Sequence, residues 1–173
     1  MSKEEKKVKR RDFLFTASYT IGAVGLGAVI LPLIHQMNPD KAQQALATTE
    51  VDISQVEPGN SITVLWRGKP VFLKRRTQKE ISEAIAVSLS DLPDPQKDEE
   101  RVKEGKDEWL VMLGVCTHLG CVPLKDKGEY NGWFCPCHGS HYDVSGIIRK
   151  GPAPTNMEIP KYEFVDNNTI KIG

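Results

Sequence analysis

The 173-residue sequence lacks net charge, internal repeats and long low-complexity tracts. Its 23 basic residues are balanced by 23 acidic ones. A neutral total argues against a dedicated nucleic-acid binder, so we expect no nucleic acid among the partners. The length allows one modest domain with an appendage.

Cysteine is scarce, and its four copies are confined to two short segments near the C-terminus. Residues 116–121 read Cys-Thr-His-Leu-Gly-Cys, and residues 135–141 read Cys-Pro-Cys-His-Gly-Ser-His. Soft thiolates and imidazoles drawn from two loops predict a metal site. Zinc is one candidate, but its structural sites commonly use Cys-x-x-Cys and His-x-x-x-His pairs. Here each loop offers one Cys-x-His or Cys-x-x-His pair, which fits two irons better than one tetrahedral ion.

Long hydrophobic runs are absent with one exception, residues 13–34, which contain no charged side chain. At about 1.5 Å per residue, a helix of this length spans the roughly 30 Å hydrocarbon core of a membrane. A buried core helix is the alternative, but apolar residues on all faces argue against it. We therefore expect one transmembrane helix.

A basic segment precedes this run, and residues 9–14 read Lys-Arg-Arg-Asp-Phe-Leu. This pattern resembles a twin-arginine export signal; a plain basic flank of a membrane helix is the alternative. Six Lys and Arg residues among the first eleven favour a cytoplasmic N-terminus over residues 1–12, with the rest of the chain exported. Residues 45–47 (Ala-Leu-Ala) have the small-x-small form of a cleavage site. They lie well beyond the apolar run, so we expect a retained anchor.

The remainder of the chain reads as a tether and a β domain. Residues 35–50 are polar and predict a flexible tether. Residues 51–173 carry short β-rich stretches between turn signals, which indicates a mainly β, antiparallel domain. The expected elements are a hairpin over 62–75, a helix over 78–89, a solvated loop over 91–108, and strands over 109–115, 158–165 and 169–172.

The two Cys/His segments resemble those of the Rieske iron–sulfur family, and both motifs of its quinol-oxidising branch stand intact. The resemblance continues through Tyr142 and the Gly-Pro-Ala-Pro sequence at 151–154, and it reaches back to the membrane anchor. It implies a small antiparallel β-sandwich with an inserted cluster-binding subdomain at about 110–155. It also implies one [2Fe–2S] cluster held by two Cys on one iron and two His on the other.

Roles for individual residues follow from the same resemblance. A disulfide would tie the two loops together, which agrees with export to an oxidising compartment. The resemblance assigns Cys116 and Cys135 to one iron, His118 and His138 to the other, quinol-facing iron, and Cys121 and Cys137 to the disulfide.

Further residues would surround the cluster. Ser140 and Tyr142 match hydroxyl donors to the cluster sulfurs, which would raise its potential. Leu119 matches a side chain that shields the cluster and contacts the quinone pocket. Gly120 and Pro152 match positions beside the cluster, the latter in a proline loop over 151–154. His141 is expected to be a polar surface or loop residue.

The function implied is that of the Rieske subunit of a bacterial ubiquinol–cytochrome c reductase. Such a subunit takes one electron and a proton from ubiquinol at a cytochrome b subunit and passes the electron to a c-type cytochrome, supporting proton translocation. The resemblance places it in a dimeric complex of the inner membrane, single-pass, with the Rieske domain periplasmic. Alternatives are a soluble Rieske ferredoxin or oxygenase component, an arsenite oxidase small subunit, and a plastoquinol–plastocyanin reductase subunit.

Overall fold

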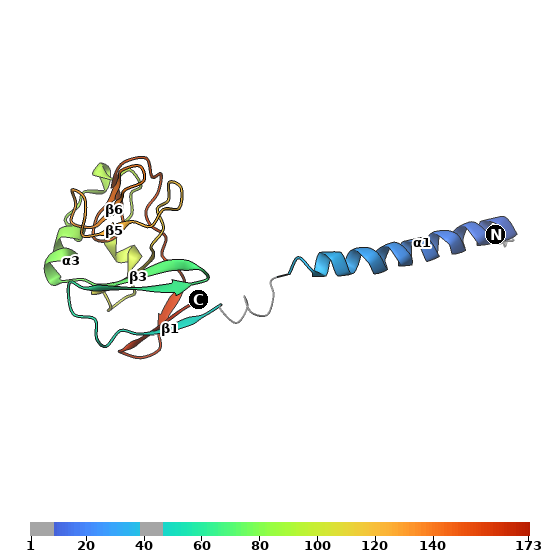
Figure 1. Cartoon of the computed structure of the whole chain (residues 1–173), viewed down its shortest axis with the longest axis horizontal. Helices are drawn as coiled ribbons and strands as arrows, with labels where there is room; N and C mark the ends of the chain where they lie inside the picture. Colours follow the sequence, from blue (N-terminus) through green and yellow to red (C-terminus); the bar gives the residue numbers. More distant parts are fainter. Residues whose placement is uncertain (1–8, 39–46) are drawn as a thin grey trace, which may run out of the picture. The chain divides into compact units, whose positions relative to one another are not determined.

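The computed structural model describes residues 9–38 and 47–173. The chain divides into two compact units, Met1–Gln44 and Ala45–Gly173, and some elements of each are labelled in Figure 1. Residues 39–46, which include half of the expected tether over 35–50 and part of the candidate cleavage sequence, lie outside the described residues. The tether is shorter than predicted, because His35 ends helix α1 (Arg10–His35) and strand β1 (Thr49–Asp52) begins at Thr49.

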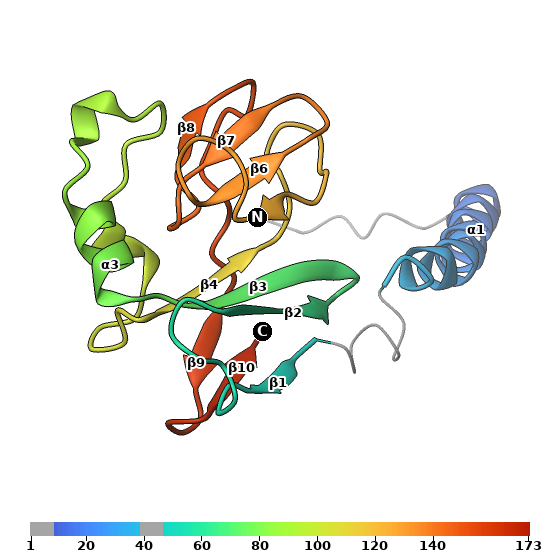
Figure 2. The same cartoon turned by 60° about the vertical axis from the view of Figure 1, so that its left-hand side comes forward.

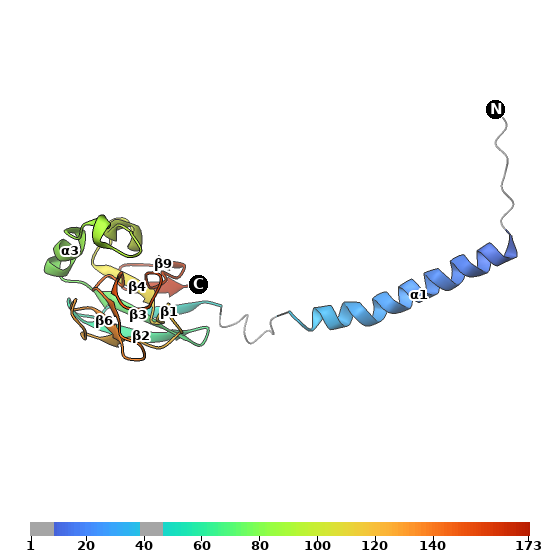
Figure 3. The ribbon, with the colours of Figure 1, turned by 90° about the horizontal axis from the view of Figure 1, so that it is seen from above.

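In the first unit, the described residues 9–38 form one helix, α1 (Arg10–His35), which is drawn without interruption in Figure 3. It is three residues longer than the apolar run at its N-terminal end, and its length and composition suffice to cross a membrane. The hydroxyls of Thr16 and Thr20 each donate to the carbonyl oxygen four residues earlier, at 2.8 Å. Their polar groups are thereby satisfied within the helix, as an apolar surrounding requires.

Two antiparallel sheets form the base of the second unit (Figure 2). The hairpin predicted over 62–75 is confirmed, and its two-residue turn has positive φ at both Arg67 (49°) and Gly68 (74°). Such a turn matches the right-handed twist of the strands it joins. One sheet has the order β1 (Thr49–Asp52), β10 (Thr169–Ile172), β9 (Tyr162–Phe164); the other has β2 (Ser61–Trp66), β3 (Lys69–Arg75), β4 (Trp109–Leu113).

A third antiparallel sheet is inserted between β4 and β9 and carries both Cys/His segments. Its order is β5 (Leu124–Lys125), β6 (Trp133–Cys135), β7 (Ser140–Tyr142), β8 (Ile148–Lys150). Figure 2 shows the β2–β3–β4 sheet between this sheet and the β1–β10–β9 sheet. The prediction of a mainly β domain with an inserted subdomain is confirmed.

Strand β4 is buried at all five positions because its two faces pack against different cores. Side chains alternate across a strand, so Val111 joins the core of the base sheets whereas Leu110 and Met112 join the core of the inserted sheet. Phe72 of β3 also faces the second core, and its ring stacks on Trp133 at 4.3 Å between centroids. The inserted sheet therefore packs directly against strands β3 and β4.

The helix predicted over 78–89 is shorter in the structure. It spans α3 (Gln78–Ile85) and begins with a capping box between Thr77 and Glu80. Ser88 has extended backbone angles and precedes a 3-10 turn, η1 (Leu89–Asp91), so a continuous helix to Leu89 does not form.

The expectation of a solvated loop over 91–108 is wrong for its central part. The 3-10 helix η2 (Asp98–Arg101) buries both terminal side chains. Asp98 Oδ1 lies 2.6 Å from Arg76 Nη1, and Arg101 Nη2 donates to the Met157 carbonyl oxygen at 2.7 Å. These charges are buried because partners elsewhere in the chain satisfy them.

The strand predicted over 158–165 is limited to β9 (Tyr162–Phe164). Pro160 precedes it and has no N–H to donate to a ladder, which is consistent with the later start of the strand.

Candidate metal centre

Two loops bring the predicted site residues together. The first connects β4 to β5 and the second connects β6 to β7. Each folds back on its first cysteine: Gly120 N–H donates to the Cys116 carbonyl at 2.9 Å, and Gly139 N–H donates to that of Cys135 at 3.0 Å. Both glycines have positive φ (83° and 75°), and a Cβ on either would meet no atom within 4 Å. Gly120 therefore serves the backbone conformation of the loop.

A disulfide between Cys121 and Cys137 joins the loops, with 6.7 Å between the Cα atoms. The predicted pairing is confirmed. The bridge leaves Cys116 and Cys135 as the free thiols, and each residue is only 2% exposed.

Each free cysteine is followed closely in sequence by a histidine, and the two imidazole rings lie next to each other in space. The ring centroids of His118 and His138 are 4.7 Å apart, edge to face. His138 is exposed, whereas Nδ1 of His118 is buried without a hydrogen-bond partner among the described residues. A buried polar atom with no partner costs free energy, and metal ligation is one explanation of such an atom.

A different trio of sulfurs also clusters closely. Those of Cys121, Cys135 and Cys137 lie within 4.8 Å of one another. Two of them form the disulfide and are not thiolates, so only Cys135 of the trio remains a metal donor. The trio shows that the disulfide lies directly against one of the free thiols.

Tyr142 supports the other free thiol. Its side chain is fully buried, and its Oη donates to Cys116 Sγ at 3.3 Å while accepting from Thr117 N–H at 3.1 Å. Burial raises the pKa of Cys116, but hydrogen bonds from Tyr142 and the backbone of His118 outweigh it, so that this pKa lies below its usual value. Burial and the bond to Cys116 raise the pKa of Tyr142 to about 12, so the phenol remains a donor at neutral pH.

The loop 151–155 packs on both Cys/His segments. Gly151 has φ 108°, and a Cβ there would lie 2.6 Å from the Gly139 carbonyl oxygen. Ala153 N–H donates to Ser140 Oγ at 3.2 Å, and Thr117 Oγ1 donates to the Thr155 carbonyl oxygen at 2.6 Å. Pro152 itself is exposed. Thr117 and Ala153 were missed from sequence, although Thr117 lies inside the first motif and Ala153 inside the proline loop.

Three apolar side chains in the first loop and in β5 are exposed. Leu119 is 71% exposed, and Val122 and Leu124, which the sequence did not single out, are 50% and 48% exposed.

His141 is not part of this site. Alternation along β7 places it on the opposite face from the buried Ser140 and Tyr142. Its Nδ1 accepts the N–H of Glu129 at 3.2 Å, and its ring contacts Phe134.

Comparison with known families accounts for both units. The family described as "Rieske [2Fe-2S] domain" matches residues 48–163, and that described as "Ubiquitinol-cytochrome C reductase Fe-S subunit TAT signal" matches residues 1–40. A protein of Blastochloris viridis named "Ubiquinol-cytochrome c reductase iron-sulfur subunit" is 54% identical over 173 residues, covering 99% of this chain and 97% of its own. The chain belongs to this Rieske family.

Further relatives agree with this assignment. The protein of the same name from Rhodospirillum rubrum is 56% identical over 169 residues, covering 95% of this chain and 91% of its own. A solved Rieske-fold chain described as "Hyperthermophilic respiratory Complex III" is 29% identical with a TM-score of 0.53, covering 90% of this chain and 97% of that one. The apolar α1 and the twin-arginine-type segment fit a membrane-anchored Rieske subunit with its domain on the other side of the membrane.

The Rieske site accommodates the [2Fe–2S] cluster that the family carries. Such a cluster requires two thiolates for one iron and two imidazoles for the other. The chain offers two buried free thiols and two facing imidazoles, one with a partnerless buried nitrogen. The donor set therefore fits the cofactor in number and type.

Proposed function

We propose that this chain is the Rieske electron-transfer subunit of a bacterial ubiquinol–cytochrome c reductase. Cys116 and Cys135 hold one iron of its cluster, and His118 and His138 hold the other. One observation carries the assignment: two buried thiols and two facing imidazoles, drawn from two disulfide-joined loops, supply a complete Rieske donor set.

The bound cluster supplies one-electron chemistry at a potential raised by its imidazole ligands. His138 is the exposed imidazole, so its free ring nitrogen is available to accept a hydrogen bond from a quinol hydroxyl. A reduced cluster would make the site more negative and would favour a proton on that nitrogen, so His138 is the residue that would take the proton of the same quinol. His118 faces it with Nδ1 turned into the protein.

The surroundings adjust this chemistry. Leu119 lies exposed beside the imidazoles, where it excludes water from the cluster and contacts the wall of the quinone pocket. The hydroxyls of Ser140 and Tyr142 donate to sulfur and stabilise the more negative, reduced state. Both effects favour transfer of an electron from quinol.

The proposed partners are a cytochrome b subunit, a c-type cytochrome and ubiquinol. Leu119 contacts the cytochrome b subunit during reduction, and the domain then moves to the c-type cytochrome. The second quinol electron passes to haem on another subunit, because one cluster accepts one electron. Helix α1 anchors the chain in the inner membrane of a dimeric, proton-translocating complex, with the N-terminus cytoplasmic and the Rieske domain periplasmic.

Two measurements test this proposal on the full chain in native membranes. The reduced protein should show the electron paramagnetic resonance (EPR) signal of a Rieske cluster, and the chain should co-purify with haem-bearing b- and c-type cytochromes. Zinc without iron in the purified protein would overturn the cluster. A potential near −150 mV, the bottom of the Rieske range, would overturn quinol oxidation, whereas one near about +300 mV supports it.

A further inference from the structure

Asn156 lies two residues after the proline loop (151–154) and is hydrogen-bonded at its backbone N–H and at both polar atoms of its side chain. Its backbone N–H donates to Asp94 Oδ2 at 2.8 Å, and its Nδ2 donates to the Asp94 carbonyl oxygen at 3.1 Å and to Gln96 Oε1 at 3.2 Å. Its Oδ1 accepts the N–H of Ile148 at 2.9 Å. The residue is only 8% exposed. Because Ile148 lies before the proline loop and Asn156 after it, these bonds close the two ends of the loop on one another and on Asp94.

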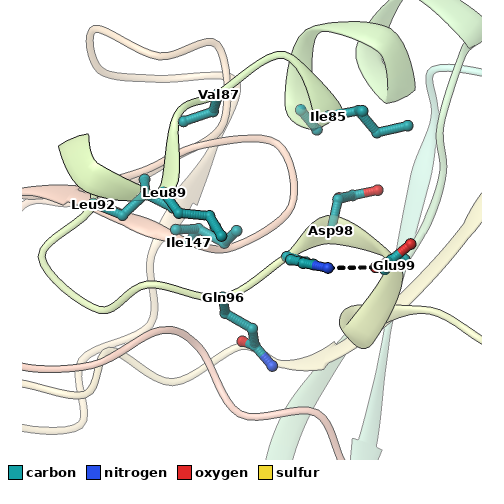
Figure 4. Close-up of a pocket in the computed structure, with 10 residues that line it drawn as sticks. Ile85, Val87, Leu89, Leu92, Gln96, Asp98, Glu99 and Ile147 are labelled. Atoms are coloured by element: carbon teal, nitrogen blue, oxygen red, sulfur yellow. Dashed lines mark hydrogen bonds and ion pairs between the residues drawn. The ribbon is translucent and has the colours of Figure 1, made fainter.

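The segment that carries Asp94 is itself fixed on both sides. Leu92 is 7% exposed and lines a groove of about 340 Å³ together with Ile147, as Figure 4 shows. On the other side, Asp98 is held by Arg76 and by the Ser145 hydroxyl, each at 2.6 Å. Asp94 therefore lies between two buried residues, Leu92 and Asp98, which hold its segment in place while its carboxylate accepts from Asn156.

The proline loop reaches the cluster through Ser140. A serine hydroxyl has one proton to donate and two lone pairs that accept. Ala153 N–H occupies a lone pair of Ser140 Oγ, so the hydroxyl proton is directed elsewhere. Ser140 pairs directly with Cys135 across β6 and β7, so the two side chains lie on the same face of the sheet. The Ser140 side chain is also a hydrogen-bond partner of Cys116. The orientation of the Ser140 donor thus depends on where the proline loop holds Ala153.

We propose that Asp94 and Asn156 are positioning residues for the redox centre. They hold the proline loop so that Ala153 orients the Ser140 hydroxyl toward the sulfurs of the site, which raises the potential of the cluster. The inference rests on the cluster assignment proposed above. Neither residue is in either Cys/His motif, and Asp94 is 62 residues from Asn156 in sequence.

The test compares two neutral replacements of Asp94. Asp94→Asn keeps an oxygen that accepts the Asn156 N–H, whereas Asp94→Ala does not. Both remove the same negative charge, so any through-space effect on the potential is common to the two. The potential of each full-length variant is measured in membranes by EPR-monitored redox titration. We expect Asp94→Ala to have a lower potential than Asp94→Asn, by no more than the decrease that Ser140→Ala causes.

Glu158 provides the matched control. It is an exposed acid two residues from Asn156, and its side chain makes no hydrogen bond or ion pair within residues 9–38 and 47–173. Glu158→Ala and Glu158→Gln should therefore have equal potentials. Should Asp94→Ala fail to assemble the cluster, Asp94→Ser replaces it, since a serine hydroxyl is also neutral and too short to reach the Asn156 N–H.

A double-variant cycle shows whether Ser140 transmits the effect. In the Ser140→Ala background the hydroxyl is gone, so Asp94→Ala and Asp94→Asn should no longer differ. Equal potentials in the Ser140-containing chain, or a difference that persists without Ser140, would overturn the inference. A missing Rieske signal in the unmodified chain would instead overturn the proposed function, so the two failures are distinguishable.

Discussion

Replacement of Tyr142 by Phe removes one oxygen atom from the surroundings of the cluster. That oxygen donates to Cys116 Sγ at 3.3 Å and accepts from Thr117 N–H at 3.1 Å. The ring is fully buried in the core of the inserted sheet, and Phe retains that ring, so the packing is expected to survive. The variant therefore isolates the hydroxyl.

The expected change in potential follows from the strength of the lost bond. A hydrogen bond to a charged acceptor contributes about 1.5–3 kcal/mol, and only the part that differs between the two oxidation states affects the potential. A tenfold change in the equilibrium constant for one-electron reduction corresponds to ~1.4 kcal/mol and to ~59 mV. A difference of about 1 kcal/mol between the two oxidation states therefore shifts the potential by roughly 40 mV. The donor stabilises the more negative, reduced state. We expect Tyr142→Phe to lower the potential by about 40–60 mV and to slow quinol oxidation by up to roughly tenfold.

EPR-monitored redox titration of the full chain measures this shift. Tyr130→Phe is the control, because the Tyr130 ring contacts Arg149 and His141, outside the cluster site. Loss of the acceptor for Thr117 N–H would also lower stability, by about 1–3 kcal/mol, but in both oxidation states alike. The reasoning is refuted if Tyr142→Phe retains the cluster at an unchanged potential, or if Tyr130→Phe shifts the potential equally.

Three further outcomes are expected. Replacing His138 by Ala should abolish the Rieske EPR signal, whereas replacing His141 by Ala should retain it; loss of the signal in both variants contradicts the assigned ligands. Cys137→Ala opens a disulfide that spans 16 residues, which should lower the free energy of unfolding by about 3 kcal/mol and make the thermal midpoint insensitive to reductant. Glu80→Gln leaves Lys74, whose side chain is 2% exposed, without its carboxylate at 2.8 Å and should cost about 3 kcal/mol at pH 7 in urea unfolding. Burial raises the pKa of Glu80, but hydrogen bonds, chiefly from Lys74, hold this pKa below its ordinary value of 4.5. The loss of stability in Glu80→Gln should therefore be present above pH 4.5 and disappear as the pH falls below it. A loss of stability that does not depend on pH would contradict the pairing of Glu80 with Lys74.

The disulfide was predictable from sequence because its signal is local. All four cysteines lie in two motifs whose resemblance to a known family assigns each one a role, and the observed pairing of Cys121 with Cys137 agrees. The hairpin over 62–75 was predictable for the same reason, since β-rich stretches flank a short turn that contains Gly68. The approach of the two imidazoles also agrees with the resemblance.

The buried charged residues of the segment 91–108 were not predictable in this way. Composition alone assigned residues 91–108 to solvent because they are rich in acids and bases. A charge is buried when a partner compensates it. Arg101 has one partner nearby in sequence, Gln96, but Asp98 and Arg101 also bind Arg76, Ser145 and Met157 from other parts of the chain. Periodicity and motif spacing describe neighbours in sequence, so they do not reveal such pairs.

The site has two sides with opposite exposure, and this division suits an electron carrier with two partners. The cysteine side is closed, since Cys116 and Cys135 are each 2% exposed and adjoin strands of the inserted sheet. The histidine side is open, because His138 lies in the loop between β6 and β7 rather than on a strand. Water therefore has little access to Cys116 and Cys135, whereas the imidazole of His138 remains accessible from outside the domain. The strand that carries Cys135 is fixed on the closed side. Phe72 of the β2–β3–β4 sheet stacks on Trp133, two residues before Cys135, so a large aromatic contact holds β6 against that sheet.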